Sequence, residues 1–197
     1  METRELWHGG RLPGLISSIK PPTKGKWEMG PGLYLTTHYS TAQRYAKGNK
    51  ATYKIQLARG TELSRITVDK NTLFDFIKQT YSKVNAQVLL SYYNNPANVV
   101  RSTKEGQFVL GPLLNLTIND ELLSSSKAAK LTEFFVQCGA DYSINEHFGG
   151  RTETVLVLYN PKLLKRVTAM PAKEWSPGWE PSDLKVKQLT EFFRTTP

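Results

Sequence analysis

Hydrophobic and polar positions follow strand-like patterns in several parts of the chain. Residues 51–57 alternate with a period of two, which is typical of a strand buried on one face. Residues 154–159 form a continuous apolar run of the length expected for a central strand. Shorter β-prone stretches occupy residues 4–8, 33–37 and 141–144. The chain therefore carries strand signals towards both of its ends.

The middle of the chain has helical spacing instead. Apolar residues recur near every third or fourth position over residues 68–93, which predicts one or two helices that end before Pro96. Residues 121–137 are again amphipathic, and Gly139 is placed to stop that helix. Residues 97–118 lack a strong period, so we expect an irregular, mobile insertion there.

A short helix is expected after residues 33–37. It would run through Ala42 and Tyr45, with either Thr37 or Ser40 as its N-cap, because both side chains can accept from the first backbone amides. Together, these elements predict an α+β fold.

The domain organisation follows from length and from the last residues. We expect residues 1–170 to form one domain, and residues 171–197 to form a C-terminal tail with a possible helix at 182–193. The tail carries Trp175 and Trp179, and docking on the domain would remove these aromatic side chains from water.

Composition excludes several classes of protein. Of 197 residues, 39% are hydrophobic and 22% charged, and no stretch approaches the ~20 apolar residues of a membrane span. The N-terminus has no secretory pattern, so we expect a soluble, cytoplasmic protein. The lone Cys138 excludes an internal disulfide, and the three His residues form no cluster at metal-ligand spacing, so no metal is expected.

Three short motifs follow one another along the chain. Residues 6–10 read Leu-Trp-His-Gly-Gly, a strand that ends in glycines. Residues 30–35 read Gly-Pro-Gly-Leu-Tyr-Leu, followed by Ser40 and Tyr45. Glu153 then leads into the apolar run that ends at Tyr159. In this order and spacing the motifs resemble the ADP-ribosyltransferase superfamily, in its diphtheria toxin and poly(ADP-ribose) polymerase branch.

The resemblance implies a split β-sheet core with flanking helices, and NAD⁺ as the substrate. Cleavage of the nicotinamide–ribose bond passes through an oxocarbenium-like state, which a carboxylate stabilises. By the resemblance, the catalytic residues would be Glu153, His8 and Tyr34. Glu153 would bind the ribose 2′-hydroxyl, steady the developing cation, and orient or deprotonate the acceptor.

The resemblance also implies how NAD⁺ is held. His8 would hydrogen-bond the adenosine ribose, and the main chain of Gly9 would pair with the nicotinamide amide. Tyr34 and Tyr45 would stack on the two faces of the nicotinamide ring, and Ser40 would add a polar contact.

The position of the glutamate departs from the family pattern. The pattern favours the position of Val155, which is closer to Tyr159 than Glu153 is. Positions 153 and 155 share strand parity, so Glu153 would keep the same face. Glu146, before the Gly149-Gly150 turn, is the alternative catalytic acid.

The distribution of charged residues indicates which kind of molecule would accept the ADP-ribose. Residues 1–60 hold ten Lys and Arg against three acidic residues, and such a surface attracts polyanions. Lys20, Lys24 and Lys26 would bind phosphates, while Trp27 and Tyr39 would stack on bases. We therefore expect a nucleic acid, RNA or DNA, in preference to protein.

The resemblance further suggests a toxin of a toxin–antitoxin or phage-defence system, with an antitoxin protein as partner. Three rival functions stay open. The first is a protein-modifying ADP-ribosyltransferase, the second an NAD glycohydrolase with water as acceptor. The third is a non-catalytic module of the same fold that binds ADP-ribose or nucleic acid.

Overall fold

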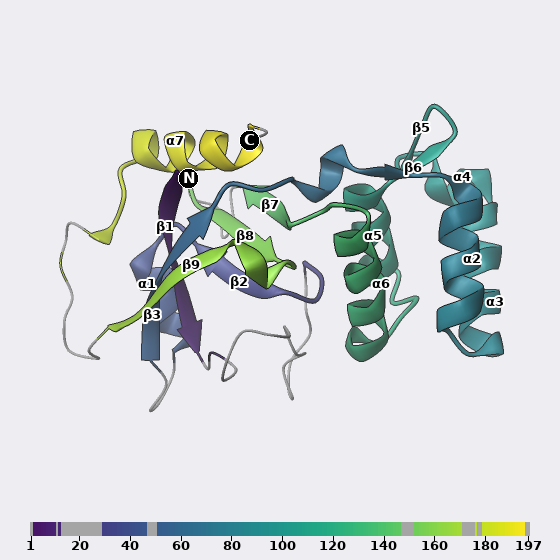
Figure 1. The fold of residues 1–197 in the computed structure, drawn as a ribbon, viewed down its shortest axis with the longest axis horizontal. Coiled ribbons are helices and arrows are strands. Elements are labelled where there is room, and N and C mark those ends of the chain that lie inside the picture. Colours follow the sequence, from purple (N-terminus) through teal and green to yellow (C-terminus); the bar gives the residue numbers. More distant parts are fainter. Residues whose placement is uncertain are drawn as a thin grey trace. The chain divides into compact units, whose positions relative to one another are not determined.

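Strands from both ends of the chain form one sheet in this computed structural model, which describes residues 2–10, 12, 29–46, 51–146, 152–170, 176 and 179–195. The strands are β1 (Thr3–Gly10), β2 (Leu33–Thr36), β3 (Ala51–Ala58), β7 (Tyr142–Glu146), β8 (Thr154–Leu158) and β9 (Leu164–Met170). They lie in the order β7-β8-β2-β1-β3-β9, and every neighbouring pair is antiparallel (Figure 1). The structure confirms the α+β class and the predicted strands.

Strand β9 has no counterpart among the sequence predictions. It pairs with β3 at one edge of the sheet, and most of its residues are exposed or half-buried. An edge strand that buries few side chains needs no regular apolar pattern, so β9 has no strand signal in the sequence.

One face of the sheet carries the main core. Helix α7 (Asp183–Arg194) packs against this face through Phe192 and Phe193 (Figure 1). The Tyr142 hydroxyl lies 2.7 Å from the Phe193 carbonyl, which joins the end of the helix to β7. The buried members of this core are Leu6, Leu33, Leu35, Ile55, Leu57, Tyr142, Leu156, Leu158, Phe192 and Phe193.

The other face carries α1 (Tyr39–Tyr45), where Tyr39 and Ala42 pack with Trp7 and Trp179. Neither predicted cap residue caps this helix. The N-cap is His38, without a side-chain cap bond, and the carboxylate of Glu180 instead accepts from the Ser40 amide at 2.6 Å. An acidic side chain from a distant segment thus satisfies an amide of the first turn.

The chain divides into two compact units, and the sheet with α1 and α7 is the first. The second contains residues 29–32 and 63–140. Its elements are a 3-10 turn at Leu63–Arg65, β4 (Thr67–Val68), α2 (Lys70–Thr80), α3 (Lys83–Asn94), α4 (Pro96–Val99), β5 (Thr103–Lys104), β6 (Gln107–Val109), α5 (Leu110–Asn119) and α6 (Ser125–Gln137). A further 3-10 turn, Pro161–Leu163, precedes β9 in the first unit.

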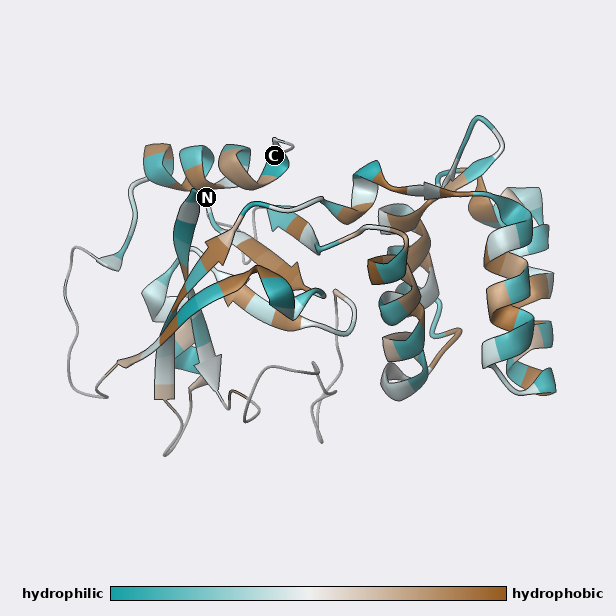
Figure 2. Ribbon diagram, viewed as in Figure 1, coloured by the Kyte–Doolittle hydropathy of each residue, from teal (hydrophilic) through white to brown (hydrophobic). Residues whose placement is uncertain are grey.

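The expectation of an irregular insertion at residues 97–118 is wrong, because α5 lies largely within it. This helix buries Leu110, Gly111, Leu113, Leu114 and Thr117, and apolar residues surround much of its circumference. Figure 2 shows hydrophobic and hydrophilic residues alternating along α2 and α3, which the sequence predicted. A helix that is apolar on several sides gives no such period.

Within the described residues, no helix is both long and apolar enough to span a bilayer.

Candidate functional site

Glu153 is a buried carboxylate that lies immediately before β8. Only 2% of its surface is exposed. Thr36 Oγ1 donates to Glu153 Oε1 at 2.5 Å, and Thr41 Oγ1 donates to Oε2 at 3.0 Å. A buried carboxylate is costly unless it is hydrogen-bonded, and here each oxygen has its own hydroxyl donor.

Strand register explains how these groups meet. Thr36 pairs with Val155 across β2 and β8, and Glu153 precedes Val155 by two residues. Side chains two apart share a face, so the Thr36 hydroxyl and the Glu153 carboxylate point to the same side of the sheet. Val155, the position that the family pattern favours for glutamate, is instead a buried strand residue.

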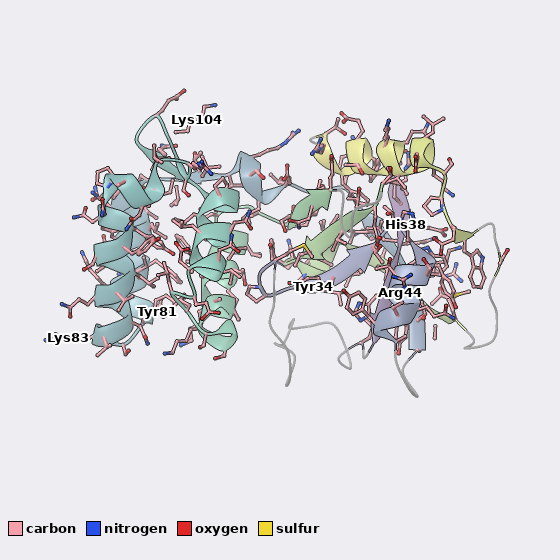
Figure 3. All side chains as sticks on the ribbon, turned by 180° about the vertical axis from the view of Figure 1, so that it is seen from behind. Tyr34, His38, Arg44, Tyr81, Lys83 and Lys104 are labelled. Carbon is pink, nitrogen blue, oxygen red and sulfur yellow. The ribbon has the colours of Figure 1, made fainter. Side chains whose placement is uncertain are left out.

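The residues around Glu153 form a hydrogen-bonded network at the start of α1. The His38 amide donates to Thr36 Oγ1 at 3.1 Å. Thr37 Oγ1 accepts from the Thr154 amide at 3.2 Å and lies 2.9 Å from His38 Nδ1. Figure 3 shows Tyr34 on β2, and His38 and Arg44 near the two ends of α1.

Three residues of this site, Thr36, Thr41 and His38, cannot be recognised as site residues from the sequence alone. Thr36 lies in a β-prone run and Thr41 inside a helix, where threonine is ordinary. Their shared partner is more than 100 positions away along the chain. The available signal was the density of hydroxyl and imidazole groups in residues 36–41, Thr-Thr-His-Tyr-Ser-Thr.

His8 is joined to Tyr34 through the main chain. Strands β1 and β2 pair at a single position, Trp7 with Thr36, and beyond it His8 Nδ1 lies 2.9 Å from the Tyr34 carbonyl oxygen. A carbonyl only accepts, so Nδ1 donates. The imidazole also stacks near the Tyr53 ring, with 6.2 Å between centroids.

The predicted catalytic residues do not all lie on one face of the sheet. Strand alternation places the His8 side chain on the face of the main core, and that of Tyr34 on the face of α1. The Glu153 carboxylate bonds Thr41 of α1, so it shares the face of Tyr34.

The glycines at the end of β1 lie directly against α1. A Cβ on Gly9 would be 1.6 Å from the Ala42 carbonyl oxygen, so only glycine fits there. Gly10 has φ of +129° and lies beside the Tyr45 carbonyl. The side chain of Tyr45, at the end of α1, is 60% exposed. The structure therefore brings the Gly9-Gly10 and Tyr45 segments together.

Glu146, the alternative acid, occupies the exposed end of β7. It pairs with Thr154 across the strands and forms an ion pair with Arg194 of α7 at 2.6 Å. A hollow of about 220 Å³ borders both Glu146 and Glu153. Its lining is completed by Thr152, Thr154, Val186, Lys187, Thr190, Glu191 and Arg194.

The predicted acceptor-binding residues Lys20, Lys24 and Lys26 lie outside the described residues, as does Trp27. The base-stacking role expected of Tyr39 is wrong, because its side chain is 1% exposed. Its ring centroid lies 5.0 Å from that of Trp7 and 4.9 Å from that of Trp179, so it belongs to the core under α1.

Across the part of the chain that the structure describes, no three His, Cys, Asp or Glu side chains are grouped closely enough to hold a metal ion. No protein-family model matches the chain, and neither a curated protein nor a solved structure matches it.

Proposed function

We propose that this protein cleaves the nicotinamide–ribose bond of NAD⁺ and transfers ADP-ribose to an acceptor, with Glu153 as the catalytic carboxylate. The observation that carries the proposal is the hydrogen bonding of Glu153. Hydroxyls from β2 and α1 bind its two oxygens, and these elements also carry Tyr34, Ser40 and Tyr45.

The sheet supports the same proposal. The resemblance implies a split β-sheet core, and β1 and β2 are neighbours that pair at a single position. Where they diverge, the His8 ring bonds the Tyr34 carbonyl at 2.9 Å. Nε2, the second ring nitrogen of His8, would bind a hydroxyl of the adenosine ribose.

The remaining roles follow from the resemblance. The main chain of Gly9 would bind the nicotinamide amide, beside the segment of α1 from Ala42 to Tyr45. Tyr34 and the exposed Tyr45 would stack on the nicotinamide ring, with Ser40 as a polar contact. Glu153 would stabilise the positive charge that develops on the ribose as nicotinamide leaves.

For the acceptor, we propose a nucleic acid. The chain has a formal net charge of +9, and the excess lies in residues 1–60, with ten Lys and Arg against three acids. Phosphate neutralisation by such a segment would concentrate RNA or DNA near the site. In the cell, we propose that the protein acts as a toxin or in phage defence, with an antitoxin protein as its partner.

The test is NAD⁺ turnover by the wild type and by two matched variants. Glu153→Gln keeps the side-chain shape and loses the charge, so nicotinamide release should fall by about 100-fold or more while NAD⁺ affinity stays within a few-fold. Glu146→Gln is the control, because this exposed acid is ion-paired with Arg194. It should retain most of the activity.

The same reactions, run with NAD⁺ labelled in its adenylate and with separate RNA, DNA and protein pools, identify the acceptor. Label in a nuclease-sensitive, protease-resistant product supports a nucleic acid, and label in protein alone contradicts it. Nicotinamide release without transfer would indicate a glycohydrolase. Loss of activity in Glu146→Gln but not in Glu153→Gln would assign the catalytic role to Glu146. Absence of nicotinamide release by the wild type would refute the proposal.

A further inference from the structure

Two threonine hydroxyls hold the carboxylate of Glu153 from different elements. Thr36 lies at the end of β2, and Thr41 lies in the middle of α1. All three side chains are buried, with 6%, 6% and 2% of their surfaces exposed for Thr36, Thr41 and Glu153. Rotation of the carboxylate about its last bond would stretch both hydrogen bonds, so the plane of the group is set by two separate anchors.

The direction of one of these bonds is fixed by the backbone. Thr36 Oγ1 accepts from the His38 amide at 3.1 Å, and an amide nitrogen only donates. The single proton of the Thr36 hydroxyl is therefore directed to Glu153 Oε1.

Thr41 lies in the helix that contacts both the Glu153 carboxylate and Gly9 at the end of β1. Its neighbour Ala42 presents the carbonyl that lies where a Gly9 side chain would be. Helix α1 therefore contacts both the carboxylate of Glu153 and the main chain proposed to bind nicotinamide. A shift of α1 would move both groups together.

We infer that Thr36 and Thr41 are positioning residues that hold the Glu153 carboxylate in the orientation that the reaction requires. The inference rests on the proposed function. Neither threonine is assigned a contact with NAD⁺, and both act through Glu153. Removal of a hydroxyl should therefore lower the rate of the chemical step and leave substrate binding almost unchanged.

The experiment compares valine and serine at each position in the full-length protein. Thr→Val keeps the branched shape and removes the hydroxyl, whereas Thr→Ser keeps the hydroxyl. For NAD⁺ cleavage we expect Thr36→Val and Thr41→Val to lower kcat by about 10- to 100-fold, with KM within about twofold. Thr36→Ser and Thr41→Ser should recover most of kcat.

A purely structural role makes a different prediction. Thr117→Val is the control, because Thr117 is also fully buried with a bonded hydroxyl but lies in the second unit. Thr117→Val should lower the stability of the protein but leave kcat per folded molecule unchanged. Thermal unfolding gives the folded fraction of every variant, and if Thr36→Val does not fold, Thr41→Val, which keeps the Thr36 bond, carries the test.

The outcomes separate the two hypotheses. Wild-type kcat in the folded valine variants overturns the positioning role and leaves the proposed function intact, as does an equal loss of kcat in valine and serine variants. The positioning role and the proposed function are both supported if activity is lost in Glu153→Gln, lowered in the valine variants and recovered in the serine variants. No nicotinamide release by the wild type overturns the proposed function and this inference with it.

Discussion

Gly9 shows how a single residue sets the distance between a strand and a helix. Its Cα faces the Ala42 carbonyl, and an added Cβ would lie 1.6 Å from that oxygen. Because the clash is with backbone, no side-chain rotation relieves it. The His-Gly-Gly motif therefore has a packing reason, separate from any ligand, for its first glycine.

Gly9→Ala should lower the free energy of unfolding by about 3 kcal/mol or more, since α1 must move away from β1. Gly10→Ala is a matched control, because its φ of +129° strains an alanine, although the nearest atoms lie 3.8 Å away. That strain should cost about 1–2 kcal/mol. Urea unfolding followed by far-UV circular dichroism measures both, and equal stability of Gly9→Ala and the wild type would contradict the contact with α1.

At the residue scale the sequence identified the motifs but not their partners. His8, Gly9 and Glu153 stood out because glycines after a strand and an acid before one are recognisable locally. The hydroxyls that bind Glu153 come from residues 112 and 117 positions away, and only the pairing of β2 with β8 brings them together. Strand register of this kind is not visible in local spacing.

At the scale of elements, α7 is held to the sheet by a buried phenol. The Tyr142 hydroxyl lies 2.7 Å from the Phe193 carbonyl and 2.9 Å from the Gly60 carbonyl, and accepts from the Gly60 amide at 3.3 Å. Burial raises the pKa of Tyr142 to about 12, since removal from water disfavours the phenolate. Burial also raises the pKa of Tyr159.

Stability should therefore fall in alkali. In the unfolded chain these phenols ionise near pH 10. Their folded pKa values are higher, so the contribution of Tyr142 is complete below about pH 10 and is lost as the pH rises towards 12. The contribution of Tyr159 is also complete below about pH 10 and is lost at higher pH. Thermal midpoints measured from pH 8 to 12 should decline above about pH 10.

Tyr142→Phe is the control for this decline. At neutral pH it should cost about 1–3 kcal/mol, because it leaves buried backbone groups of Gly60 and Phe193 without their hydroxyl partner. Its midpoint should fall less steeply than that of the wild type above pH 10, with Tyr159 still contributing. Parallel curves for the two proteins would show that Tyr142 does not cause the alkaline loss.

Several of the elements that could be predicted have one buried face. β3 is half-buried and alternates, and α2 and α3 carry apolar stripes, so their patterns were visible. β9 is mostly exposed or half-buried, and α5 is apolar on several sides, so neither has the period that marks its class. β8 is buried on both faces and could be predicted for another reason, because its continuous apolar run has the length of a central strand.

At the scale of the whole molecule, the chain leaves the first unit after Glu62 and returns at Asp141. These two points are adjacent within that unit. The Asp141 amide donates to the Thr61 carbonyl at 2.8 Å, and Glu62 bridges to Tyr142. Residues 63–140 are therefore connected to the first unit like an inserted domain, whose ends lie close together.

We expect the first unit to fold without this insertion. A variant in which a short Gly/Ser linker joins Glu62 to Asp141 should unfold cooperatively, because the main core and the Thr36–Glu153–Thr41 bonds all lie in the first unit. Residues 29–32 would lose packing, since they belong to the second unit, where Leu114 lies against Gly30. We therefore expect stability below that of the full chain, with the near-UV circular dichroism of the buried Trp7 and Tyr39 retained. The same deletion carrying Gly9→Ala serves as the control and should lose further stability through the contact with Ala42. A deletion variant without cooperative unfolding or near-UV signal would show that residues 63–140 are part of the folding unit of the sheet.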